Sequence, residues 1–357
     1  MKFIFAIFLI CIPLIACSCA KHSESQSPSV VLYTSTDDEF ARLIARAFTD
    51  ETGIVVKLVG DTEATKTTGL VARLKAESSN PSADVWWSSE PFGTIDLTNA
   101  RVLQTGALDG IVSDDWPTAL HDPDWSWLGF ASRARVIAYA SDRVESPPTT
   151  LRELAQQDWK GRIGMARPQF GTTRGHMGIL ASRWGLGEFE RWVTQLKSNN
   201  IRLYDGNASV VRAIAMGEID VGLTDTDDVW SGQRNGWKVD CVYEAFDPPM
   251  LTSTLASFGP TLLPNTVGIV SGAPNPEHAK RLARFLVSDR VETLLAESES
   301  RNLPASPALI DLYTSIAPQV ANPDQNGPGI AQRFDDFSDA LSMIPQALDI
   351  CDRVLAP

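Results

Sequence analysis

The chain has 357 residues, of which 43% are hydrophobic and 21% are charged, and its formal net charge is -13 at pH 7. This composition is that of a globular protein, and such a length usually corresponds to two lobes or domains. An acidic surface repels phosphodiester backbones, so the charge argues against nucleic acid as a partner. A small cation would instead be attracted.

The N-terminus predicts export. Lys2 precedes an apolar run over residues 3–15, and the letters LIAC stand at residues 14–17, at the end of this run. The run is shorter than the about 20 residues that span a bilayer, so we interpret residues 1–16 as a removed signal peptide and Cys17 as the lipidated first residue of the mature protein. Residues 17–29 then form a flexible linker. Lipidation at Cys19, or plain secretion, remains an alternative.

Alternating strand and helix patterns follow in chain order. We expect strands over residues 30–33, 54–59 and 83–87, with helices over 36–48 and 70–75 between them. The letters TDDE at residues 36–39 match a capping box at the start of the first helix. This βαβαβ order predicts a parallel sheet.

A second set of βαβ units begins near Trp159. Its expected strands are residues 162–165, 201–204 and 219–224, and its expected helices are residues 173–184, 189–196, 210–216 and 229–235. Two extended segments, 128–139 and 258–270, are long enough to cross between the two sets. We therefore predict an α/β fold of two doubly wound lobes joined by a hinge of two crossover segments.

We assign residues 30–132 plus 262–357 to lobe 1, including a helix over 277–286, and residues 133–261 to lobe 2. A disulfide between Cys241 and Cys351 can be drawn, with two buried free thiols as the alternative, because sequence does not fix pairing.

Hard oxygen donors gather where ligands bind in such sheets, beyond the carboxyl ends of the strands. The candidate metal ligands are Asp37, Asp38, Glu63, Glu90, Asp225, Asp227 and Asp228. So many carboxylates in one cleft do not all stay ionised without a cation. Each acid also has a simpler explanation, since aspartate is favoured in the first turn of any helix.

The loop FGTTRG, residues 170–175, suits an anion, because it places glycine, hydroxyls and Arg174 at a strand-to-helix turn. Gly171, Thr172 and Thr173 are the candidate anion ligands there. Arg133 and Arg135 share one face of an extended segment, and Arg133 is the candidate to balance charge in the cleft. A helix cap, and surface or hinge ion pairs, are the alternatives.

Trp86, Trp87 and Trp230 flank the acidic loops and could stack on an organic cation. Core packing is the alternative for at least one of the first two, because neighbouring strand residues face opposite sides of a sheet.

Six segments of the chain resemble the ferric-iron-binding branch of the periplasmic solute-binding proteins of ABC importers. In chain order they are VVLYTS, ADVWWSSEP, WLGFASRARVIAY, WKGRIGMARPQFGTT, GNASVVRAIAMGEIDVGLTDTDD and LLPNTVGIVSGAPNPEHAKRLARFL. The resemblance covers nearly the whole mature chain. It implies a type II two-lobed fold that closes on its ligand by hinge motion.

The resemblance also implies a ligand set. The family's acid after the third strand matches Glu90 or its neighbourhood, and Asp37 or Asp38 stands in the first loop. The family's tyrosine pair falls on Asp227 and Asp228, so both phenolates are replaced by carboxylates. The anion site falls on Gly171, Thr172 and Asn207.

We therefore predict an extracytoplasmic lipoprotein, anchored to the membrane and not an enzyme, that delivers cargo to an ABC permease. The expected cargo is ferric iron or another metal cation, with a synergistic anion, and no prosthetic group; an organic cation is the alternative. We expect a monomer. An exported hydrolase, with His176 as the histidine to mutate, and a ligand sensor are the rival classes.

Overall fold

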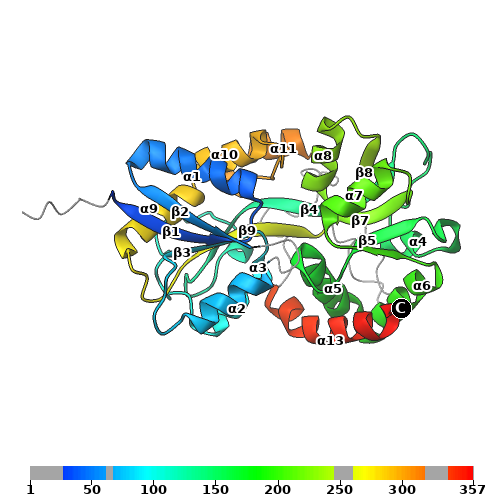
Figure 1. Ribbon diagram of the computed structural model, residues 1–357, viewed down its shortest axis with the longest axis horizontal. Coiled ribbons are helices and arrows are strands. Elements are labelled where there is room, and N and C mark those ends of the chain that lie inside the picture. Colours follow the sequence, from blue (N-terminus) through cyan, green and yellow to red (C-terminus); the bar gives the residue numbers. More distant parts are fainter. Residues whose placement is uncertain (1–26, 62–66, 245–259, 318–336, 357) are drawn as a thin grey trace, which may run out of the picture.

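One long strand connects the sheets of two α/β lobes (Figure 1). The computed structural model of the protein describes residues 27–61, 67–244, 260–317 and 337–356. The strands are β1 (Ser29–Thr34), β2 (Val55–Gly60), β3 (Val85–Ser88), β4 (Leu128–Ala140), β5 (Ile163–Ala166), β6 (Arg202–Tyr204), β7 (Val221–Asp225), β8 (Val239–Tyr243) and β9 (Leu262–Ile269). They pair in the order β2-β1-β3-β9-β4-β7-β5-β6, and β8 also pairs with β4.

Helices cover both faces of these sheets. They are α1 (Asp38–Thr52), α2 (Thr68–Ala76), α3 (Pro91–Asn99), α4 (Leu151–Leu154), α5 (Gly171–Trp184), α6 (Leu186–Ser198), α7 (Asn207–Ala215), α8 (Thr226–Arg234), α9 (Pro276–Leu286), α10 (Asp289–Glu297), α11 (Ile310–Ile316) and α13 (Phe337–Leu355). No helix of the described ranges is long and apolar enough to cross a membrane.

The predicted parallel units are confirmed in both lobes. In the first, β1 pairs in parallel with β2 and β3, and in the second, β5 pairs in parallel with β6 and β7. The adjacent side chains of Trp86 and Trp87 enter separate apolar clusters and are both fully buried. Both tryptophans therefore belong to the core, and neither is an aromatic cage for a cation.

The first crossover segment is the 13-residue strand β4. Residues 128–134 of β4 pair with β9 of the first sheet, whereas residues 135–140 pair with β7 and β8 of the second. A single strand thus belongs to both sheets, and the change of partner falls between Arg133 and Arg135. The second expected crossover segment, residues 258–270, contains β9, which lies in the first sheet. Residues 258 and 259 of that segment are outside the described residues.

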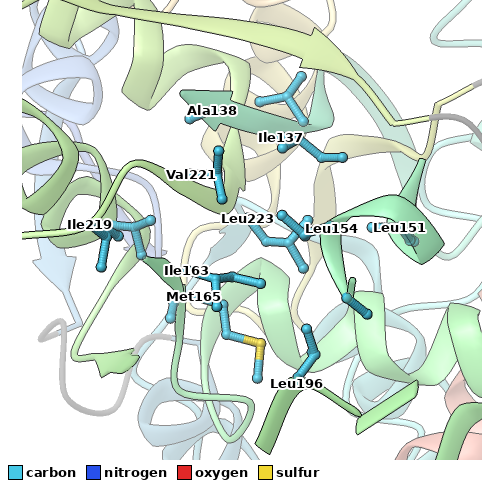
Figure 2. Packing of buried hydrophobic residues seen from close by; sticks show 14 of the residues in the cluster. Ile137, Ala138, Leu151, Leu154, Ile163, Met165, Leu196, Ile219, Val221 and Leu223 are labelled. Carbon is cyan, nitrogen blue, oxygen red and sulfur yellow. The ribbon is translucent and has the colours of Figure 1, made fainter. Parts of the chain in front are cut away.

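The core of the second lobe is built from β4, β5 and β7 with the helices around them. Ile137, Val221, Leu223, Ile163 and Met165 meet there (Figure 2). All five side chains are completely buried. The parallel strands β5, β6 and β7 end at the same edge, which antiparallel β4 enters at Arg135, and the loops beyond that edge form the candidate site.

Two sequence expectations are wrong in detail, and one open alternative is decided. We placed residues 262–357 in lobe 1, but α13 packs against α5 and α6 of the second lobe (Figure 1). The capping box at residues 36–39 does not form, because the N-cap is Asp37 and its side chain makes no capping bond. Cys241 on β8 and Cys351 on α13 are free thiols, which confirms the free-thiol alternative over the disulfide.

Candidate functional site

A cavity of about 330 Å³ opens where the loops of both lobes meet. Its lining residues from the second lobe follow β5, β6 and β7, while Arg133 comes from β4, and the described residues of the first lobe contribute Asp37 and Ser89. The lining residues are Asp37, Ser89, Arg133, Ala166, Arg167, Phe170, Gly171, Thr172, Thr173, Asp205, Gly206, Asn207, Ala208, Asp225, Asp227 and Asp228. The rule that ligands lie beyond the carboxyl ends of strands therefore predicted the place.

Asp225, the last residue of β7, is the most constrained carboxylate of the cavity. One oxygen accepts from the Arg135 guanidinium at 2.7 Å, and the other accepts from the Thr172 hydroxyl at 2.5 Å and from the Asn207 amide at 2.8 Å. Burial alone would raise the pKa of Asp225, but Arg135 and Arg133 hold it below its usual value. Asp225 is therefore an ionised anchor of the site.

Asp227 and Asp228 lie in the first turn of α8, just beyond that anchor. Oxygen atoms of Asp225, Asp227 and Asp228 come within 4.8 Å of one another, a spacing that one metal ion could bridge. Asp228 accepts from the Thr224 hydroxyl at 3.3 Å. Both side chains are half-buried, so the cluster faces the cavity from a fixed helix start.

Arg133 links the two lobes across the cavity. Its guanidinium donates to the Ser89 carbonyl at 2.5 Å and contacts the Asp227 carboxylate at 3.3 Å. Burial would lower the pKa of Arg133, but the carboxylates of Asp227, Asp225, Asp37 and Asp228 raise it above its usual value. The arginine is thus a built-in counter-ion to the acidic cluster.

Arg135 was expected at a surface or hinge ion pair, and the structure places it in a buried one. Its side chain is fully buried and pairs with Asp225 behind the cavity. The expectation that Arg133 and Arg135 share one face of β4 is consistent with their contacts to neighbouring aspartates of α8 and β7.

Two of the candidate metal ligands turn away from the cavity. Asp38 is exposed and pairs with Arg42 one helical turn later at 2.6 Å. Glu90 caps α3, since its carboxylate accepts the backbone N–H groups of Phe92 and Gly93. Neither carboxylate lines the acidic cavity, and Glu63 lies outside the described residues.

The predicted anion ligands lie at the cavity wall but already hold one another. Gly171 has a φ of 57°, a left-handed conformation that glycine adopts without strain. Asn207 donates to Thr172 and accepts from Thr173, in addition to its bond to Asp225. These side chains therefore form the support of Asp225.

Sequence reasoning missed Arg167 and Asp205. They directly follow β5 and β6 and pair with each other at 3.3 Å. The strand-end rule, applied to every strand of the second lobe, would have included both.

Other candidate side chains lie elsewhere. His176 is fully buried, with Nε2 at 3.0 Å from a carboxylate oxygen of Glu244, and burial lowers its pKa. The Trp230 ring is nearly buried and faces the Arg301 guanidinium. None of the five tyrosines of the chain, all of them described, lines the cavity.

Residues 30–298 match the family described as bacterial extracellular solute-binding protein. The chain belongs to this family. Iron uptake protein A1 of Synechocystis is 28% identical to this solute-binding protein over 294 residues, 76% of this chain and 75% of the relative. A Salmonella typhimurium protein named for binding 2-aminoethylphosphonate is 23% identical over 267 residues, 73% of each chain.

The iron-bound HitA protein of Pseudomonas aeruginosa superposes with a TM-score of 0.72 at 21% identity, covering 92% of this chain and 99% of HitA. This likeness confirms the two-lobed fold predicted for the solute-binding protein. Membership of a family of binding proteins also confirms that the chain is not an enzyme. The hydrolase hypothesis, with His176 at its centre, is therefore wrong.

Proposed function

We propose that this solute-binding protein captures a metal cation in its interlobe cavity, with ferric iron as the cargo, and delivers it to the permease of an ABC importer. The observation that carries the proposal is the cluster of Asp225, Asp227 and Asp228, whose oxygen atoms lie within 4.8 Å of one another. Carboxylate oxygens are hard donors that suit hard cations.

The charge of the lining supports a cationic cargo. Five aspartates line the cavity against two arginines, Arg133 and Arg167. Arg133 contacts the Asp227 carboxylate at 3.3 Å, so a cation would have to compete with its guanidinium. Names of relatives such as iron uptake protein A1 favour iron among the metals.

The donor set distinguishes this proposed site from one built on tyrosines. With no tyrosine in the lining, ferric iron would be held by carboxylates and by atoms of the cargo's own anion. We therefore expect iron-loaded protein to lack the visible absorption band of a phenolate bound to ferric iron.

A small organic solute with a cationic group is a second candidate. The cavity of about 330 Å³ is of the size that small-molecule sites have. It also holds arginines beside its aspartates, which would suit a solute carrying both charges. The relative named for 2-aminoethylphosphonate makes this class worth testing.

Thermal unfolding of chelator-treated protein separates the two candidates. We expect ferric citrate to raise the melting temperature, because a ligand at 100 times its dissociation constant adds about 2.7 kcal/mol to stability. Asp228→Asn should weaken that effect, whereas Asp38→Asn, an acid outside the cavity, should leave it unchanged. Stabilisation by 2-aminoethylphosphonate, with none by any metal, would instead establish the organic solute.

We also propose that the protein is an extracytoplasmic lipoprotein held near its permease by Cys17. The flexible linker over residues 17–29 would let the cavity reach a membrane partner. A cell that expresses the full chain should retain it in the membrane fraction, and Cys17→Ser should release it. Equal release of both forms would contradict the anchor.

A further inference from the structure

A second cavity lies between the lobes, on the other side of the α5 N-terminus from the acidic one. Its volume is about 250 Å³, and its walls come from α2 and α3 of the first lobe and from α5 of the second. Gly171 borders both cavities. The proposed function makes no use of this space.

Arg174 brings a cation to the second cavity from α5. Its side chain is half-buried, and in the part of the chain that the structure describes no hydrogen bond or ion pair holds its guanidinium. The guanidinium carries five N–H donors in a planar fork that matches oxyanions. The donors of Arg174 are thus available to a ligand.

Thr67 brings a hydroxyl from the opposite lobe. The residue is 4% exposed, and its Oγ1 has no hydrogen-bond partner among the described residues. A buried polar group left without a partner destabilises the folded protein. Its backbone is also held at φ 71° and ψ -51°, a conformation that β-branched residues rarely adopt. Such costs tend to gather at ligand sites.

The remaining polar groups of the cavity are already satisfied. Glu90 accepts the N–H groups of Phe92 and Gly93, and Lys75 pairs with Asp96 at 2.7 Å. Gly93 is needed there, since a Cβ on it would lie 2.6 Å from the Thr67 methyl group. The groups of the cavity that still lack a hydrogen-bond acceptor among the described residues are therefore the donors of Arg174 and Thr67. A ligand rich in acceptor atoms would satisfy them.

We propose that the second cavity binds a small oxyanion, a carboxylate or phosphate, between the Arg174 guanidinium and the Thr67 hydroxyl. Charge-assisted hydrogen bonds to Arg174 would provide most of the affinity. Because the two residues belong to different lobes, the anion bridges the lobes and favours their closed arrangement. Cargo and anion binding are then coupled, each strengthening the other. The proposal holds for any cargo of the first cavity.

The test is thermal unfolding of chelator-treated full-length protein in sodium phosphate and sodium acetate, each against sodium chloride of equal ionic strength. We expect phosphate or acetate to raise the melting temperature. Arg174→Gln and Thr67→Val should each weaken the anion about tenfold or more, as loss of a hydrogen bond to a charged group does. Thr67→Ser keeps the hydroxyl and should retain binding.

Arg167→Gln is the matched control, because Arg167 lines only the acidic cavity. It should leave the anion effect unchanged. The proposal is overturned if neither anion stabilises the wild-type protein beyond chloride. It is equally overturned if Arg174→Gln keeps the effect and Arg167→Gln loses it, since the anion would then occupy the first cavity.

Discussion

The two walls of the acidic cavity differ in how their acids are held. On the second lobe, Asp225 is locked by Arg135, Thr172 and Asn207 and carries Asp227 and Asp228 in the next turn. On the first lobe, the described residues that reach the cavity are Asp37 and Ser89. The acids nearby serve other purposes, Asp38 in a surface ion pair and Glu90 as a helix cap.

This difference indicates that the two lobes contribute to cargo binding in different ways. A binding face whose side chains are fixed by their own hydrogen bonds loses little entropy when cargo arrives. The second lobe is such a face, whereas the described part of the first lobe supplies the Asp37 carboxylate and the Ser89 carbonyl, which accepts a hydrogen bond from Arg133. Cargo would therefore meet the second lobe first, and closure of the first would complete the site.

The largest expected loss of stability comes from removing Arg135, the buried partner of Asp225 in the second lobe. Arg135→Gln leaves Asp225 buried without its cation, and removal of one partner of a buried pair costs about 3–5 kcal/mol. Urea unfolding should show this loss. Arg353→Gln is the control, because Arg353 pairs with Glu190 at the surface, where an ion pair contributes little to stability. Equal losses in the two variants would show that the buried pair of Arg135 and Asp225 does not stabilise the second lobe.

A second prediction concerns how the first lobe holds β4. Glu292 of α10 is fully buried and accepts the N–H groups of Ala131, Ala305 and Ser306. Ala131 has a φ of 42° and lies where the register of β4 shifts. Burial raises the pKa of Glu292 to about 7, although the three N–H groups lower it.

Between pH 4.5 and about 7 the Glu292 carboxyl is protonated in the folded protein and ionised in the unfolded chain. Protonation of Glu292 therefore stabilises the fold at low pH, and this stabilisation is lost as the pH rises through about 7. Relative to Glu292→Gln, the wild-type free energy of unfolding should fall by about 3 kcal/mol from pH 4.5 to pH 8. Urea unfolding of both proteins at several pH values measures it. A difference that does not change with pH would rule out the titration of Glu292.

The smallest expected effects are on the first-lobe wall. Asp37→Asn removes one carboxylate of the cavity and should weaken cargo about tenfold, as a lost charged hydrogen bond does. Asp38→Asn, its neighbour outside the cavity, should change affinity by less than about twofold, since an exposed pair with Arg42 contributes little. Calorimetric titration with ferric citrate compares the two. Identical affinities would show that Asp37 does not contact the cargo.

The sequence predicted most of the fold because its signals are local. Strands β1 to β3 and β5 to β7 follow apolar runs bounded by turn residues, and each begins and ends within about two residues of its prediction. Helix α13 was placed on the wrong lobe, because an amphipathic helix shows which face it buries but not what covers that face.

The site was predicted only as a set of loops. The strand-end rule found Asp37 and the group from Asp225 to Asp228, but it treated every acid in a loop alike. Asp38 lies one position beyond the cavity, and Glu90 lies one position beyond Ser89 and turns back to cap α3. Successive side chains of a helix point about 100° apart. An error of one residue in the predicted start of a helix therefore changes which side chain faces the cavity, and hydrophobic periodicity does not fix that start.

Anomalous diffraction at the iron edge, from crystals of the protein loaded with one equivalent of ferric iron, would locate the metal. If carboxylates of the second lobe hold the cation, one strong peak lies between the carboxylates of Asp227 and Asp228. A peak at another position, or none at full loading, would show that these carboxylates do not hold iron.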